Sequence, residues 1–210
     1  MKIVLNTLLV GIIIFLTFMC FRSIRGPMEF EKEQKHREEA IKERLMDIRK
    51  AQIEYKNMYG FHAGSFDDLI KFLDEDRLPF VSREGSLTDE QLAKGMTEQR
   101  AIKEGLIRRD TTWILAKDTL FGHGFNTAAL RNVPIDGINA QFSMDTATIA
   151  SASGYTVKVF ESGVLYDTYL GDLNRQQLIN LKDRVNKMGR YLGLRVGSVK
   201  EINNNAGNWE

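Results

Sequence analysis

The hydrophobic residues of this chain begin with one apolar run, from Ile3 to Phe21, in which no residue carries a charge and only Asn6, Thr7 and Thr17 are polar. At a rise of ~1.5 Å per residue the run is about 28 Å long as a helix, which matches the hydrocarbon core of a bilayer. The pattern therefore predicts a helix that contacts membrane lipid through residues 3–21. We expect residues 1–25 to form a transmembrane anchor that crosses the membrane once.

Two other interpretations of this run are a cleaved secretory signal and a lipid anchor on Cys20. A cleavage site needs small residues, and the flank from Phe18 to Arg22 is mostly bulky. The residues before Cys20 are also too large for a lipoprotein signal. We expect an uncleaved anchor in which Cys20, the only cysteine, is a small apolar residue facing lipid.

A charged segment follows the anchor, and an amphipathic pattern follows the charged segment. From Glu29 to Glu39 nearly every residue is charged or polar, which is typical of a solvated helix. The pair Gly26-Pro27 either separates two helices or kinks one continuous helix. We expect residues 26–60 to form a stalk helix that Gly60 ends as a left-handed cap.

The second half of the stalk carries an apolar face with helical spacing. The residues of this face are Ile41, Leu45, Ile48, Gln52, Tyr55 and Tyr59. Among them Ile41, Leu45, Ile48 and Tyr55 are candidate interaction residues. They either cover a sheet of the chain's own domain or form the seam of a coiled-coil dimer. Fewer than three clean heptads are present, which favours packing within the chain.

Residues 61–210 are expected to form one α+β globular domain. Helix-capping patterns predict short helices from Ser65 to Leu73, from Thr88 to Gly105, and from Asp172 or Asn174 to Gly189. Strand patterns are found at 111–117, 130–135, 140–144, 155–161, 164–170 and 194–199, with a tight hairpin at Phe160–Val164. Together they predict a long transmembrane-plus-stalk helix packed on a small antiparallel sheet, with additional short helices.

The composition and the motifs bound the chemistry. Lys and Arg number 29 and Asp and Glu 28, so the net charge of +1 gives no strong field for nucleic acid, and we expect no nucleic-acid partner. No zinc-protease, dithiol, nucleophile-elbow, P-loop or dinucleotide-binding motif is present. His36 lies in the charged stalk, and His123 lies in a glycine-rich turn. We predict a non-enzymatic protein without catalytic residues, cofactor or metal site.

The C-terminal tail, residues 203–210, is the last candidate interaction segment. Its asparagines and glycine favour turns, whereas Trp209 is a large apolar residue that favours burial or an interface. The tail either docks on its own domain or binds a partner. In both cases we expect Trp209 to be anchored.

The junction at the end of the stalk resembles that of type II secretion pseudopilins and type IV pilins. It runs from Ile48 to Tyr55, continues with Tyr59-Gly60-Phe61, and ends at Ser65–Leu69. The resemblance implies a long N-terminal helix packed on an antiparallel sheet, other protein subunits of an envelope assembly as partners, and a bacterial inner membrane with the C-terminal domain in the periplasm.

Two features differ from the pilin pattern. The chain has no short basic leader ending in Gly before an aromatic residue, and the run from Ile3 to Phe21 holds no acidic residue. The resemblance therefore does not extend to leader processing or to filament assembly of the usual kind. Lys and Arg near the span favour a cytoplasmic C-terminal side, but long domains cross membranes regardless of these charges, so the residues leave the orientation open.

Nearly the whole chain also resembles a set of uncharacterised membrane-anchored proteins of Bacteroidota. The resemblance is carried by Gly105–Thr111, Leu194–Val199 and the ending Asn203–Glu210. It implies a membrane anchor and no particular activity.

Overall fold

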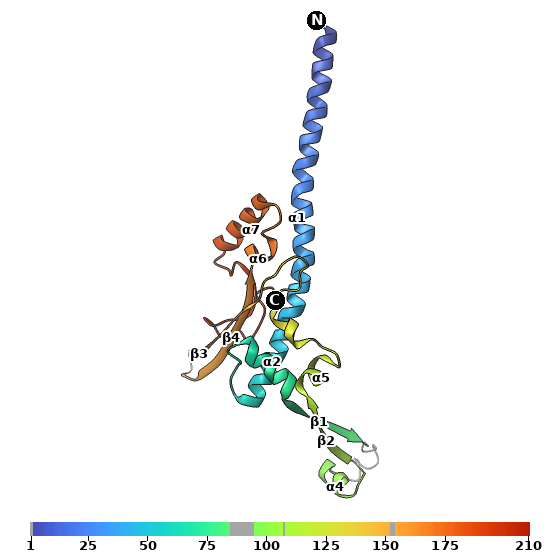
Figure 1. Cartoon of the computed structure of the whole chain (residues 1–210), viewed down its shortest axis with the longest axis vertical. Helices are drawn as coiled ribbons and strands as arrows, with labels where there is room; N and C mark the ends of the chain where they lie inside the picture. The colour runs from blue at the N-terminus through green and yellow to red at the C-terminus, as the bar shows by residue number, and fades with distance from the viewer. Residues whose placement is uncertain (1, 85–94, 107, 152–153) are drawn as a thin grey trace. The chain divides into compact units, whose positions relative to one another are not determined.

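The fold is α+β, as predicted: a long N-terminal helix is followed by short helices and small antiparallel sheets (Figure 1). The computed structural model describes residues 2–84, 95–106, 108–151 and 154–210. Two compact units are present, one formed by Met1–Ser65 with Leu130–Glu210 and the other by Phe66–Ala129. The region expected to be one domain, residues 61–210, is thus divided between the two units.

The helix α1 runs without a break from Lys2 to Tyr59. Pro27 lies inside it, so the second of the two expected arrangements, one continuous helix, is present. Within the described part of the chain it is the one helix long and apolar enough to cross a membrane. Its apolar side chains from Leu8 to Phe21 are all exposed, with Phe21 at 69%. Gly60 follows the helix with a φ of 76°, as expected for a left-handed cap.

The sheet of the first unit has three antiparallel strands in the order β3-β4-β5. These are β3 (Ser143–Ala150), β4 (Thr156–Leu165) and β5 (Gly193–Gly197). The second half of α1 packs against β4 and β5 (Figure 1). Gly197 has a φ of 72° and lies so close to the Phe160 carbonyl that a Cβ would clash with it, which explains the glycine at the end of β5.

Two short helices belong to the same unit. They are α6 (Tyr166–Leu170) and α7 (Arg175–Lys187). Asn174 caps α7, because its side-chain oxygen accepts hydrogen bonds from the backbone N–H groups of Gln176 and Gln177. Of the two residues proposed for this cap, Asn174 therefore begins the helix, and the prediction for α7 is confirmed.

The hairpin predicted at Phe160–Val164 is wrong, because β4 passes straight through these residues. Gly163 serves close strand pairing instead of a turn, since a Cβ on it would lie 2.8 Å from the Arg195 side chain. The strand predicted at 164–170 is largely the helix α6. The strands predicted at 130–135 and 140–144 are mostly irregular, with a 3₁₀ turn at Thr127–Arg131 and a single bridge between Asn132 and Gln141.

In its described residues, the second unit combines three helices with a two-stranded antiparallel ladder. Its elements are α2 (Phe66–Glu75), β1 (Arg77–Glu84), α4 (Glu98–Lys103), β2 (Arg108–Leu115) and α5 (Ala116–Phe121). Asp74 accepts bonds from Lys117 Nζ and Thr127 Oγ1, both at 2.9 Å. The capping box expected at Thr88–Gln91 lies outside the described residues.

Candidate functional site

The apolar face of the stalk is part of the core of the first unit. Ile41, Leu45 and Ile48 are fully buried where α1 meets β4 and β5. The packing within the chain that the sequence favoured is therefore present. These three residues hold the sheet on the helix and are not exposed for contact with another subunit.

A buried glutamine fixes the chain as it leaves this helix. The side chain of Gln52 is fully buried; its Nε2 donates to the Ala63 carbonyl at 2.9 Å, and its Oε1 accepts from the Ala63 N–H at 3.0 Å. Gln52 thus pairs with the backbone of Ala63 as a neighbouring strand would. These two bonds satisfy the backbone N–H and C=O groups of Ala63, so they hold the segment after Gly60 against α1.

Three aromatic side chains gather at the end of the helix, and we call them the helix-end cluster. The ring of Tyr55 lies 4.7 Å from that of Tyr59 and 5.9 Å from that of Phe61. Tyr55 is half-buried, while Tyr59 and Phe61 are 43% and 45% exposed. Of the stalk residues proposed for interaction, Tyr55 is therefore the one that lies at the surface.

Lysines from the helix and the sheet connect the helix-end cluster to β4. Lys56 Nζ donates to the Lys158 carbonyl at 3.0 Å, and Lys158 Nζ donates to the Gly60 carbonyl at 3.1 Å. The Lys158 ammonium also lies 5.5 Å from the centre of the Phe61 ring. Beside it is a surface hollow of about 310 Å³, lined by Phe61, His62, Thr146, Ala147, Thr148, Lys158 and Val159.

His62 lies beneath this hollow and is 5% exposed. Neither ring nitrogen has a hydrogen-bond partner among the described residues, and the ring lies 4.8 Å from that of Phe160. Burial, and then the positive charge of Lys56, lower the pKa of His62 to about 4. His62 is therefore a neutral core residue at pH 7, and no specific signal in the sequence points to this role.

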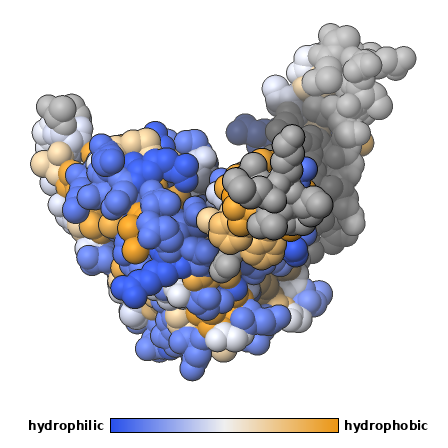
Figure 2. All heavy atoms as spheres, turned by 90° about the horizontal axis from the view of Figure 1, so that it is seen from above, coloured by the Kyte–Doolittle hydropathy of each residue, from blue (hydrophilic) through white to orange (hydrophobic). Residues whose placement is uncertain are grey.

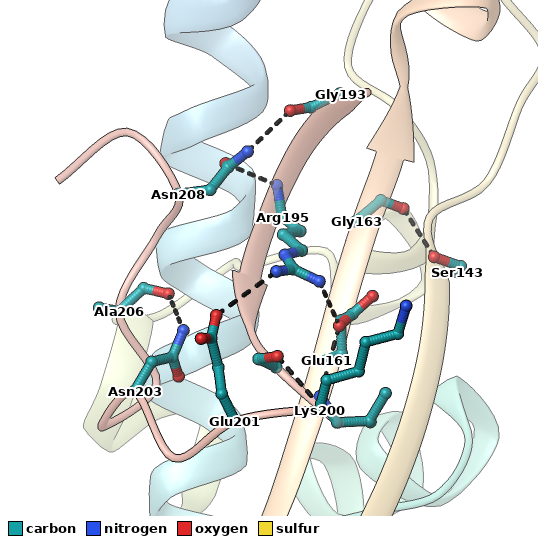
Figure 3. A network of polar contacts seen from close by, with 12 residues as sticks. Ser143, Glu161, Gly163, Gly193, Arg195, Lys200, Glu201, Asn203, Ala206 and Asn208 are labelled. Atoms are coloured by element: carbon teal, nitrogen blue, oxygen red, sulfur yellow. Dashed lines mark hydrogen bonds and ion pairs between the residues drawn. The ribbon is translucent and has the colours of Figure 1, made fainter. Parts of the chain in front are cut away.

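The C-terminal tail docks on its own unit along the free edge of β5 (Figure 3). The Asn208 N–H donates to the Arg195 carbonyl at 3.0 Å, and the Asn208 side chain bonds the Arg195 N–H and the Gly193 carbonyl at 3.0 and 2.9 Å. Trp209 is half-buried, with its indole against Gly207. Of the two expected arrangements of the tail, the docked one is present.

Ion pairs also hold the C-terminal tail and β5 in place. Arg195 Nη1 contacts Glu161 at 2.9 Å, and its Nη2 lies 3.7 Å from Glu201 (Figure 3). Glu210, at the end of the tail, pairs with Arg49 of α1 at 2.8 Å. The tail therefore joins the stalk helix to the edge strand, and it shields that edge from pairing with another strand.

At the other end of the unit, Arg37 ties α1 to the turn between α6 and α7. Its guanidinium forms two parallel bonds to Asp172, at 2.6 and 2.8 Å, and a third to the Tyr169 carbonyl at 2.7 Å. Glu33 accepts from its Nε at 2.8 Å. The hydrogen bond from Arg37 lowers the pKa of the Asp172 carboxyl, so this pair stays charged well below neutral pH.

The described residues offer little chemistry beyond these contacts. No group of three or more His, Cys, Asp or Glu side chains among them is arranged to hold a metal ion. His36 is exposed on α1, and the exposed His123 lies 3.3 Å from Asp118 in the second unit. On the face shown in Figure 2, hydrophilic residues cover most of the described surface, and hydrophobic residues form small separate patches.

Comparison of the chain with protein-family models, with curated proteins and with solved structures found no match.

Proposed function

We propose that this protein is a non-enzymatic, single-pass membrane protein that serves as a pseudopilin-like subunit of an envelope secretion or pilus-type assembly. The observation that carries the proposal is the division of α1. Its first part exposes the apolar side chains from Leu8 to Phe21, and its last part buries Ile41, Leu45 and Ile48 under a sheet of the same chain. One rigid element thus serves as anchor and as domain scaffold.

The proposed location is a bacterial inner membrane, with the C-terminal part in the periplasm. In such an arrangement the faces of α1 that the sheet leaves open are the surfaces available to other subunits. They carry four partly exposed apolar residues in the stalk, which are Met28, Met46, Ile53 and Met58, at 64%, 37%, 38% and 39%. These residues, together with the helix-end cluster, are the proposed contacts.

A second candidate is a membrane-anchored module that binds a peptide or a glycan. The hollow beside the helix-end cluster favours it, because an aromatic ring, two threonine hydroxyls and the Lys158 ammonium meet there. Aromatic rings and hydroxyl groups are suited to the face and the polar edge of a sugar or peptide. In this case the protein acts as a monomer and its partner is soluble.

Crosslinking in native membranes, followed by mass spectrometry, separates the two candidates. An assembly subunit gives adducts of fixed stoichiometry with other membrane proteins of the envelope or with further copies of itself. A monomeric binding module gives no such adducts. Its soluble ligand instead protects the residues around Thr148 and Lys158 from crosslinking. An enzyme would give neither the adducts nor the ligand protection, and it would turn over a substrate.

A further inference from the structure

The outer edge of β3 is left unpaired from Met144 to Ala150 by the described part of the chain. β3 is the outermost strand of its sheet, with β4 on one side (Figure 1). On the other side, the single bridge between Asn132 and Gln141 ends just before this edge begins. The opposite edge of the sheet differs, because the C-terminal tail covers β5.

Hydrogen bonds at the two ends of β3 show which residues direct their backbone groups outward. The Ser151 N–H donates to the Tyr155 carbonyl on the β4 side, at 2.7 Å, and the Phe142 N–H donates to the Arg131 carbonyl on the outer side, at 2.9 Å. Backbone groups of successive residues point to alternate edges of a strand, so those of the even-numbered residues point away from β4. The even-numbered residues of β3 are Met144, Thr146, Thr148 and Ala150.

β3 carries few of the features that usually protect a strand edge. Its residues, Ser143–Ala150, include no lysine, proline or glycine, and Asp145 is the one charged residue. The pairing with β4 continues without a bulge. Asp145 Oδ1 accepts from the Thr146 N–H at 2.8 Å and so covers one outward donor, whereas the exposed Thr148 has no such cover among the described residues. A regular edge of this kind is a template for an added strand.

A second copy of the chain anchored in the same membrane does not fit this edge. Lys158, near the start of β4, contacts Lys56 of α1, and Tyr169, beyond the end of β4, contacts Arg37. β4 is therefore antiparallel to α1, and β3 runs in the direction of α1. Two β3 edges paired antiparallel would direct the two anchors opposite ways. Two edges paired in parallel about a two-fold axis would place like backbone groups at the same height. The occupant that fits is an extended segment of another protein.

The hollow beside the helix-end cluster lies along this edge, because Thr146 and Thr148 belong to its lining. Residues opposite each other on neighbouring strands point to the same face of a sheet. On a strand added to β3, the residue opposite Thr148 therefore directs its side chain over the hollow. Backbone bonding and side-chain recognition would thus occur at one place.

The charge at the hollow indicates which side chain it accepts. Lys158 is the partner of Thr148 on β4, so a residue opposite Thr148 on an added strand lies two strand spacings, ~10 Å, from Lys158. A glutamate and a lysine side chain together span this distance. Lys158 Nζ donates to the Gly60 carbonyl and has further donors, and the Lys56 ammonium contacts the Lys158 carbonyl. A carboxylate complements these two positive charges.

We propose that the outer edge of β3 binds an extended peptide segment of another protein by strand addition, and that a glutamate of this segment enters the hollow and pairs with Lys158. Backbone hydrogen bonds to Thr146 and Thr148 supply affinity, and the hollow supplies selectivity. On binding, the Thr146 N–H exchanges the Asp145 carboxylate for a peptide carbonyl. This inference rests on the second candidate function, the anchored binding module, and names its partner and mode of binding.

The open edge is tested by residue-resolved amide hydrogen exchange of the full chain in lipid nanodiscs. The Thr148 N–H, which points outward, is expected to exchange without protection. The N–H groups of Ala147 and Ile149 point toward β4 and are expected to be protected. Equal protection of Thr148 and Ile149 in the free chain would mean that the edge is already paired, and it overturns the proposal.

Binding is tested with a synthetic peptide of alternating valine and threonine residues that has one central glutamate. The peptide is expected to protect the Thr148 N–H. Thr148→Pro removes this outward donor without removing a bond to β4, and we expect about three- to tenfold weaker binding, the range for one backbone hydrogen bond. Thr148→Val keeps the donor and is the matched control. Retained protection of Ile149 verifies that both variants are folded. Equal binding by the two variants, or a peptide that leaves Thr148 unprotected, overturns strand addition.

The pairing with Lys158 is tested with the same peptide and with a version in which glutamine replaces the glutamate. Lys158→Met is expected to weaken binding of the glutamate peptide about two- to fivefold, the range for partly exposed ion pairs, and to leave binding of the glutamine peptide unchanged. Lys187→Met, at an exposed lysine at the end of α7, is the control and changes neither. Equal effects of Lys158→Met on both peptides overturn the glutamate assignment.

A neutral sugar, chitohexaose, separates this inference from the function on which it rests. If chitohexaose shifts the NMR signals of Phe61 and Lys158 and the peptide does not protect Thr148, strand addition fails and the binding module stands as a glycan-binding one. If neither probe shifts signals around the hollow, the inference and the second candidate function both fail.

Discussion

The side-chain amide of Gln52 forms two hydrogen bonds with the backbone of Ala63, at 2.9 and 3.0 Å, and both residues are fully buried. A helix position that would ordinarily be apolar thus holds the segment after the helix. Replacing it with a residue of similar size but no hydrogen-bonding group tests how much this pair contributes.

Gln52→Leu leaves the N–H and C=O of Ala63 buried without partners. Each unsatisfied group costs ~1–3 kcal/mol, so we expect the full chain in detergent to lose about 2–4 kcal/mol of unfolding free energy. Gln176→Leu, on the exposed side of α7, is the control, with an expected change within ~0.5 kcal/mol. Equal effects of the two substitutions on denaturant unfolding would contradict a structural role for the Gln52–Ala63 pair.

Two adjacent stalk residues separate core packing from surface contact. Leu45 is fully buried and Met46 is 37% exposed. Leu45→Asp places a charge in the core and is expected to destabilise the first unit by ~2–5 kcal/mol, whereas Met46→Asp should cost less than about 1 kcal/mol. Thermal unfolding checks both values. If Leu45→Asp left the monomer fold intact and removed only self-association, the apolar face would serve a coiled coil instead.

The neutral state of His62 makes stability depend on pH. Its pKa is about 4 in the folded chain, against an ordinary value of about 6.5 when unfolded. The unfolded chain therefore binds this proton more readily, and the stabilisation is fully present above pH ~6.5 and is lost as the pH falls through about 4. The total is at most ~3 kcal/mol.

His62→Phe, which keeps a ring without a titrating group, should remove most of this pH dependence. His123→Gln, at a side chain that is 91% exposed, should leave it unchanged. Unfolding free energies at pH 7 and pH 4.5 provide the comparison. An NMR titration in which His62 protonates near 6.5 in the folded protein would rule out the buried neutral state.

The docking of the tail can be followed through its tryptophan. Trp209 is half-buried, and the other tryptophan, Trp113, is 57% exposed. Trp113→Phe leaves Trp209 as the sole emitter, and its fluorescence should be blue-shifted relative to the Trp209→Phe variant, in which only Trp113 emits. Emission from Trp209 at the wavelength of a fully hydrated indole would be incompatible with the docked tail.

Helices were easier to predict from the sequence than strands. The caps before α2 and α7 and the glycine after α1 are local signals, and the structure places these helix ends close to where the signals predict. The strand pattern around Gly163 wrongly predicts a hairpin, because a glycine that permits close approach of Arg195 looks the same in sequence as a glycine in a turn. Residues distant in the chain decide which element packs against each face of a strand.

The candidate site was predicted only in part. The buried face of Ile41, Leu45 and Ile48 follows from helical spacing alone. The helix-end cluster brings Lys158 to Phe61 across 97 positions of the chain, a pairing that no local pattern encodes. The bidentate contact of Arg37 with Asp172 likewise depends on the docking of α6 and α7 on the helix.

The most direct test of the proposed subunit function is site-specific photo-crosslinking of the full chain in its native membrane. A photoreactive residue is placed at Met46 or Ile53, on exposed parts of the stalk, and at Gln176 as an exposed control on another helix. We predict discrete adducts with other envelope membrane proteins or with a second copy from Met46 and Ile53, and none of them from Gln176. A chain that stays uncrosslinked at both stalk positions in intact membranes would contradict it.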